Sequence, residues 1–157
     1  TLGPIRARKT KKADAQAEKP VDAEASKDAG WERIEVSEHL DSVLIEKDYD
    51  LFVLDSLTAL VKQRFSEALK ADKAISKERL RGISETVSRE VMNMVVAAKE
   101  HGRNLLVISS EVGMGVLPDG DAARFFRAET GRANQLMASL ADEAYLLVSG
   151  IPIRIKG

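Results

Sequence analysis

The chain has 157 residues, of which 44% are hydrophobic and 31% charged, and its formal net charge is −1. These values are typical of a globular protein with one domain, alone or with a tail, and argue against nucleic acid or an anionic membrane as a partner. The absence of cysteine excludes disulfides and thiolate zinc sites, and two histidines, His39 and His101, are too few for a histidine-rich metal site. No apolar run approaches the roughly 18 residues of a membrane-spanning helix, and no signal peptide is evident, so we expect a cytoplasmic protein.

Residues 1–30 differ from the rest of the chain in composition. Five of the first twelve residues are basic, and the only large apolar side chains in the segment are those of Leu2, Ile5 and Val21. So few apolar groups cannot offset the cost of ordering the chain. We therefore expect a polar segment over residues 1–30, disordered or loop-like, and one α/β nucleotide-binding domain over residues 31–157. A solvated tail is favoured over a basic arm that contacts phosphates.

The next elements are predicted from their hydrophobic periodicity. Residues 31–36 alternate apolar and charged side chains, which favours a short strand, and a helix is predicted from Glu38 to about Lys47. Its inner face should consist of Leu40, Val43, Leu44 and Ile45. Residues 51–54 form an apolar run that predicts a buried strand ending at Asp55.

Two helices are predicted between this strand and the next. The first spans residues 57–69, and a polar break follows at residues 70–76. Ser76 is predicted to cap the second helix and Gly102 to close it. Apolar residues at steps of three and four define its buried face: Leu80, Ile83, Val87, Val91, Met94 and Ala98.

The last third of the chain predicts a strand, a loop and a helix, followed by a hairpin. Residues 105–108 are an apolar run suited to a buried strand, and a loop with two glycines follows it. Asp119 and Asp121 offer capping carboxylates for a helix over residues 121–141, in which Gly131 implies a close approach by a neighbour. Residues 144–148 predict another buried strand, and residues 151–155 a final edge strand. Strands that alternate with helices indicate an α/β domain with a mainly parallel sheet.

The loop after residues 105–108 is a candidate ligand site, because ligands of open α/β sheets bind at the carboxyl ends of strands. An ordinary connecting loop is the alternative. Asp55 has two readings as well. Four apolar residues closed by an acid are typical of the magnesium-holding strand of P-loop nucleotidases, but Asp55, Ser56 or Thr58 would equally cap the next helix.

Two longer motifs carry a resemblance to a known family. They are EVGMG-x-x-P at residues 111–118 and R-x-x-R-x-x-x-G-R-x-N-Q at residues 124–135. Together with the strand at residues 51–61, the W-x-x-x-E at residues 31–35, and the ADE and VSG triplets at residues 141–143 and 148–150, they resemble the adenosylcobinamide kinase / adenosylcobinamide-phosphate guanylyltransferase family of cobalamin biosynthesis.

The resemblance implies a fold, an activity and partners. It implies a P-loop-type (RecA-like), mainly parallel sheet flanked by helices, with a C-terminal edge hairpin and assembly as a homotrimer. It implies phosphorylation of adenosylcobinamide with ATP or GTP, and then transfer of GMP from GTP through a guanylylated histidine. Mg²⁺ would assist, and the partners would be the nucleotide and the corrinoid.

Site residues are carried over by motif. Asp55 would orient Mg²⁺ or the nucleotide, and Glu35 would contact the nucleotide. A further set would line the substrate or subunit surfaces: Glu111, Arg124, Arg127, Asn134 and Gln135. Solvated helix charges are the alternative for the two arginines, and helix-to-strand hydrogen bonding is the alternative for Asn134 and Gln135.

The chain departs from the family pattern in two ways. The family opens with a strand and a G-x-x-x-x-G-K-[ST] loop that cradles phosphates, whereas this sequence contains no Gly-Lys dipeptide. The guanylylated histidine should precede Trp31, yet residues 1–30 contain no histidine, and neither His39 nor His101 is a credible substitute.

Two interpretations follow from these departures. We expect the sequence to start near the end of the second strand of such a sheet, with residues 1–3 as its last residues, and to be inactive by itself. A polar N-terminal segment is not expected to replace the missing strand. The alternative is a non-catalytic paralogue that binds nucleotide or corrinoid, or completes an oligomer.

Overall fold

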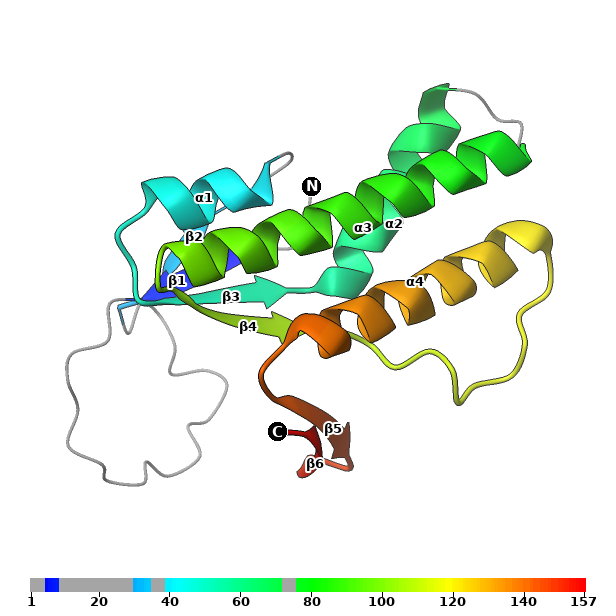
Figure 1. Cartoon of the computed structure of the whole chain (residues 1–157). Coiled ribbons are helices and arrows are strands. Elements are labelled where there is room, and N and C mark those ends of the chain that lie inside the picture. Colours follow the sequence, from blue (N-terminus) through cyan, green and yellow to red (C-terminus); the bar gives the residue numbers. More distant parts are fainter. Residues whose placement is uncertain (1–4, 9–29, 35–38, 72–75) are drawn as a thin grey trace.

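The fold alternates strands and helices along the chain. A computed structural model describes residues 5–8, 30–34, 39–71 and 76–157. Its elements are β1 (Ile5–Arg8), β2 (Glu32–Ile34), α1 (Leu40–Glu46), β3 (Leu51–Asp55), α2 (Leu57–Ala71), α3 (Lys77–Glu100), β4 (Asn104–Ile108), α4 (Asp121–Leu140), β5 (Ala144–Val148) and β6 (Ile151–Lys156) (Figure 1). The α/β class is confirmed. Residues 1–3, Glu35 and the start of the predicted helix at Glu38 lie outside the described residues.

The main sheet has the strand order β2-β1-β3-β4. β3 and β4 are parallel, with Leu51 opposite Asn104 and Asp55 opposite Ile108. β1 runs antiparallel to both β2 and β3. The parallel part of the described sheet is therefore the β3–β4 pair, a smaller share than the predicted mainly parallel sheet.

β1 corrects the expectation that the N-terminal segment supplies no strand. Its backbone pairs with β2 on one edge and with β3 on the other, and the side chain of Ala7 is fully buried, at 0% exposure. Backbone hydrogen bonds do not depend on the polarity of the side chains, so a strand paired on both edges needs few apolar residues of its own. The remainder of residues 1–30, apart from Gly30, lies outside the described part of the chain.

One hydrophobic core joins the sheet to the four helices. Its fully buried members include Leu44 of α1, Phe52 of β3, Leu60 of α2 and Val91 of α3, and Met137 of α4 packs with them. α4 contacts both α2 and α3. Among the described residues, no helix is long and apolar enough to span a membrane.

The predicted helix ends are confirmed for α3 and partly corrected for α1 and α4. Ser76 Oγ accepts a hydrogen bond from the Arg79 N–H, and Gly102 adopts φ 61° just after the helix. Ile45 of α1 is exposed rather than internal, because it lies one residue, about 100°, beyond the buried Leu44. The residue before α4 is Gly120, with no side-chain cap, so neither predicted aspartate caps this helix.

β4 and the C-terminal hairpin are less buried than predicted. Leu106 and Ile108 of β4 are 53% and 45% exposed, whereas Leu105 and Val107 pack against the core. Among the described residues, β5 and β6 pair only with each other and form a separate two-stranded sheet, so the hairpin is confirmed but not its place at the edge of the main sheet. Apolar residues on both strands of the hairpin are exposed: Tyr145, Leu147, Val148, Ile151, Ile153 and Ile155.

Candidate functional site

The parallel pairing of β3 and β4 brings their carboxyl ends to one edge of the sheet. Asp55, the last residue of β3, is paired with Ile108, so Ser109 and Ser110 follow β4 at the same edge. Asp55 is half-buried, and its peptide bond to Ser56 is cis. Within the described residues, nothing donates a hydrogen bond to its carboxylate. The carboxylate is therefore available to a ligand at this edge.

A closed ring of hydrogen bonds lies beside Asp55, and we call it the strand-end ring. The Ser110 N–H donates to Thr58 Oγ1 (2.9 Å), and Thr58 Oγ1 lies 3.1 Å from Ser109 Oγ. Ser109 Oγ donates to Asn134 Oδ1 (2.6 Å), and Asn134 Nδ2 donates to the Ser110 carbonyl (3.0 Å). Because the Ser109 proton is committed to Asn134, the Thr58 hydroxyl donates to Ser109. The ring ties the start of α2, the end of β4 and the middle of α4 together.

The loop between β4 and α4 (residues 109–120) is held by side chains of its own motif. Glu111 Oε1 accepts a hydrogen bond from the Gly113 N–H (2.5 Å). Arg127 Nη2 donates to the Gly113 carbonyl (2.7 Å), and Arg124 Nε donates to the Pro118 carbonyl (3.1 Å). The two arginines of α4 thus hold the backbone of the loop, a role that neither of the sequence-based alternatives gave them.

The structure brings only part of the predicted site set together. Asn134 belongs to the strand-end ring next to Asp55, and its bonds are the helix-to-strand contacts that the sequence analysis held open. Glu111 and the two arginines lie along the adjoining loop, whereas Gln135 is exposed on α4 outside the ring. Glu35 lies outside the described residues.

A buried carboxylate on α4 was not among the predicted site residues. Glu129 is 1% exposed, accepts a hydrogen bond from Ser84 Oγ of α3 (2.6 Å), and forms an ion pair with Arg132 (2.8 Å). The available signal was its spacing, because Glu129 lies four and eight residues before Ala133 and Met137 on the buried stripe of α4. Glu129 fixes α4, which carries the residues that hold the loop and the ring, against α3.

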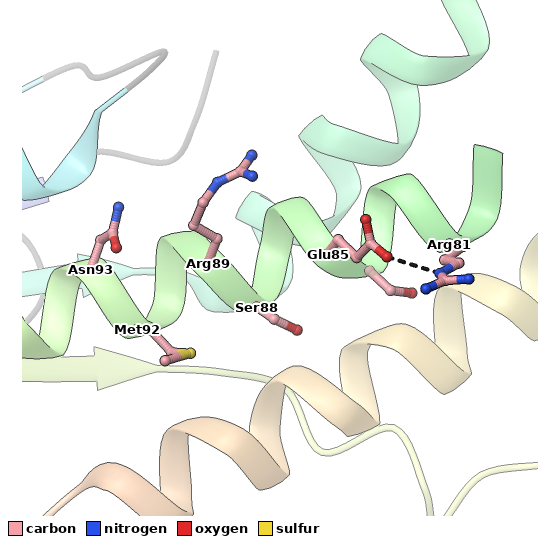
Figure 2. Close-up of a pocket in the computed structure, with 7 residues that line it drawn as sticks. Arg81, Glu85, Ser88, Arg89, Met92 and Asn93 are labelled. Carbon is pink, nitrogen blue, oxygen red and sulfur yellow. Dashed lines mark hydrogen bonds and ion pairs between the residues drawn. The ribbon is translucent and has the colours of Figure 1, made fainter. Parts of the chain in front are cut away.

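Two surface hollows lie away from the strand-end ring and the loop that follows β4. The larger, of about 510 Å³, is open and lined by one helix, α3: Arg81, Ser84, Glu85, Ser88, Arg89, Met92 and Asn93 (Figure 2). A second, of about 400 Å³, lies between α2 and α3. Neither contains a residue from the edge of β3 and β4, so the candidate site rests on that edge and not on a hollow.

Comparison with known proteins decides the family. The profile of the family described as "Cobinamide kinase / cobinamide phosphate guanyltransferase" matches residues 3–155. The chain belongs to this family. The resemblance drawn from the motifs at residues 111–118 and 124–135 is therefore confirmed.

Curated relatives of this family member carry the name of bifunctional adenosylcobalamin biosynthesis proteins. The bifunctional adenosylcobalamin biosynthesis protein CobU of Escherichia coli (strain K12) is 30% identical over 129 residues, which cover 80% of this chain and 70% of the relative. The protein of the same name from Salmonella typhimurium (strain LT2) is 32% identical over 131 residues, which cover 82% of this chain and 71% of the relative.

Asp55 fits a magnesium ion shared with a nucleotide better than a metal site built from protein ligands alone. Among the described residues, no group of three or more His, Cys, Asp or Glu side chains could hold a metal ion. Mg²⁺ at phosphoryl-transfer sites is typically bound by one or two carboxylates together with substrate phosphates. A single free carboxylate at a strand end meets the protein's share of that requirement.

Proposed function

We propose that this family member acts in cobalamin biosynthesis as an adenosylcobinamide kinase and adenosylcobinamide-phosphate guanylyltransferase. The observation that carries the proposal is the family match over residues 3–155. In the first reaction ATP or GTP would phosphorylate the aminopropanol hydroxyl of adenosylcobinamide. In the second, GMP from GTP would join that phosphate and give adenosyl-GDP-cobinamide.

The nucleotide is proposed to bind at the carboxyl ends of β3 and β4. Asp55 would hold Mg²⁺ jointly with the nucleotide phosphates, and the ion would neutralise charge on the transferring group. The strand-end ring supports this role, because it fixes the backbone that follows β4 beside Asp55. Glu35 is proposed as a further nucleotide contact on its motif alone.

A substrate or subunit surface is proposed along α4 and its loop. Arg124 and Arg127 each use one donor on a loop carbonyl, and a guanidinium has five donors, so both keep N–H groups for an anionic ligand. Gln135 is exposed beside Asn134, which supports a contact outside the ring. Glu111 would act mainly by shaping the loop through its bond to Gly113.

We further propose that the 157-residue chain, taken by itself, binds its ligands without transferring either group. It contains no Gly-Lys dipeptide for a phosphate loop and no histidine before Trp31 to carry GMP. Without such a loop, little screens the charge of the β- and γ-phosphates during transfer.

The test combines transfer with binding. The chain is incubated with adenosylcobinamide, Mg²⁺ and GTP labelled at the α- or γ-phosphate, and GTP binding is measured for Asp55→Asn and for Asp119→Asn, an exposed aspartate of the loop. We expect no transfer, and Mg²⁺-dependent GTP binding that weakens about tenfold for Asp55→Asn only. Labelled corrinoid or labelled protein would refute the inactivity, and a chain that binds neither GTP nor adenosylcobinamide would refute the function.

A non-catalytic paralogue is the second candidate, because the same two missing features favour it. It would bind nucleotide or corrinoid, or complete an oligomer. The intact mass and N-terminal sequence of the protein from its native source distinguish the two candidates. A longer chain with a GK[ST] loop supports the enzyme, and a natural start at Thr1 supports the paralogue.

We also propose a homotrimer. The exposed apolar residues of β5 and β6 support self-association, because contiguous apolar surface of this kind commonly marks a protein interface. Sedimentation velocity should show a single species of three times the monomer mass. A monomer at micromolar concentration would contradict the trimer.

A further inference from the structure

Three large apolar side chains of the loop between β4 and α4 remain unexplained by the proposed site. Met114, Val116 and Leu117 are 80%, 95% and 60% exposed. They lie within four residues of one another, in a surface loop of the kind that polar residues usually occupy. Exposed apolar groups that gather in one place commonly mark a ligand or partner surface.

The backbone of this loop is fixed while these side chains stay in solvent. Arg127 holds the Gly113 carbonyl just before them, and Arg124 holds the Pro118 carbonyl just after them. Both arginines come from α4, so the loop is anchored to the helix on either side of the apolar group. The exposed side chains are therefore presented by an anchored loop and do not result from an unrestrained one.

The distance between Asp55, the proposed place of reaction, and this apolar group limits which ligands can contact both. Asn134 binds at the end of β4, and Arg127, seven residues earlier on α4, binds beside Met114. At 1.5 Å per residue, seven helical residues span roughly 10 Å. A ligand that reacts at Asp55 and also touches the loop must be long and must be apolar at its far end.

Of the two substrates in the proposed function, the corrinoid meets both conditions. Its macrocycle is broad and carries apolar ring faces and methyl groups, and its reacting hydroxyl lies at the end of a side arm. The nucleotide is polar along its triphosphate and ribose. We propose that Met114, Val116 and Leu117 form the contact surface for the corrin ring, with the aminopropanol arm directed to Asp55; this inference rests on the proposed function.

The experiment measures equilibrium binding of cobinamide, without nucleotide, by dialysis and visible absorbance. The test protein is the double variant Val116→Ser/Leu117→Ser, and the control is Met92→Ser/Val96→Ser, which removes two exposed apolar groups from α3. We expect the cobinamide Kd to rise at least about tenfold for the loop variant and to stay unchanged for the control. The single variant Val116→Ser, at the most exposed of these positions, serves if the double variant fails to fold.

Several results would overturn the inference. An unchanged Kd in the loop variant would do so, as would an unaltered chain that binds no cobinamide. Loss of an oligomer with cobinamide binding intact would assign the loop to a contact between copies of the chain. Transfer activity of the protein from its native source is measured separately. If that protein is active but its cobinamide Kd does not change in the loop variant, this inference alone is refuted. If cobinamide binding depends on the loop but the native protein transfers neither group, the kinase proposal alone is refuted.

Discussion

At Gly113 the backbone passes too close to the Glu111 carboxylate to carry a side chain without a local shift. A methyl group at this position would lie 2.7 Å from Glu111 Oε1, the atom that accepts the Gly113 N–H. At Gly115, two residues on, an added methyl group would meet no atom of the described part of the chain within 4 Å. The two glycines of the motif therefore differ. Gly113 permits the close approach of the Glu111 carboxylate, whereas the space around Gly115 would accommodate a side chain.

This difference predicts unequal effects of one substitution. Gly113→Ala should displace the Glu111 carboxylate and break the hydrogen bond that shapes the loop, because the flexible carboxylate yields before the backbone does. A lost hydrogen bond of about 1 kcal/mol corresponds to a cobinamide Kd roughly fivefold higher. Equilibrium dialysis checks the value, with Gly115→Ala as the matched control. Equal effects at both glycines would refute the distinction.

At the scale of single residues, the positions of individual side chains could be predicted from the sequence better than their hydrogen-bond partners. Asp55 could be placed at a strand end from the apolar run before it, because that signal is local. The strand-end ring could not be predicted, since Thr58 lies 51 residues from Ser109, and Asn134 lies 25 residues from it. Those residues meet only because β3 and β4 are parallel and α4 packs back over their ends.

At the scale of elements, α4 contains a glycine without a structural need for one. A close neighbour was predicted at Gly131, but among the described residues a methyl group there would meet no atom within 4 Å outside its own helix backbone. That expectation was wrong, because helical glycine can persist without any packing demand. The residue costs helix stability, and within the described structure no close packing compensates for that cost.

Gly131→Ala should therefore stabilise the protein. We expect the free energy of unfolding to increase by up to about 1 kcal/mol, measured by urea denaturation. Gly102→Ala is the opposing control, because Gly102 has φ 61° and alanine in that conformation costs about 1–2 kcal/mol. A destabilised Gly131→Ala would show that something does approach this position in solution.

An ion cluster joins α2 to α3. Buried Arg64 donates from Nε to Glu90 (2.8 Å) and from Nη1 to Glu67 (2.9 Å). Burial raises the pKa of Glu90 above the usual value of 4.5, despite the nearby guanidinium. The folded protein therefore binds a proton at Glu90 more tightly than the unfolded chain does. The stability from this group is complete below pH 4.5 and is lost as pH rises through the raised pKa.

Glu90→Gln removes this titration and should flatten the pH dependence. Relative to the variant, the unaltered protein should lose stability as pH rises from 4.5 towards neutrality. Urea denaturation of both proteins at intervals across this range provides the measurement. Parallel stability curves for the two proteins would contradict the assignment to Glu90.

Elements with local signals were predicted, and elements that depend on distant pairing were not. α3 follows from its Ser76 cap, its apolar stripe and the glycine at its end, all within one stretch of sequence. β1 escaped prediction because its place in the sheet is due to backbone pairing with β2 and β3. The polarity of its neighbours in sequence gave the opposite indication.

At the scale of the whole molecule, the sheet is asymmetric. One flank consists of the antiparallel strands β1 and β2, and the other ends at β4, which has one exposed apolar face. Apolar runs such as residues 105–108 predict strands buried on both faces. The described residues cover only one face of β4 and leave the β5–β6 hairpin apart from the sheet. The burial of these apolar strands therefore could not be deduced from their composition.

The single partner of β4 has a consequence for the exchange of its amide hydrogens with solvent. In any strand, the N–H and C=O of one residue point to one side and those of the next residue point to the other. Among the described residues β4 pairs with β3 alone, so alternate amides along residues 104–108 should be protected, and those between them should exchange quickly. Hydrogen–deuterium exchange followed residue by residue by NMR should show this alternation between protected and rapidly exchanging amides. Uniform protection would reveal a second strand beside β4.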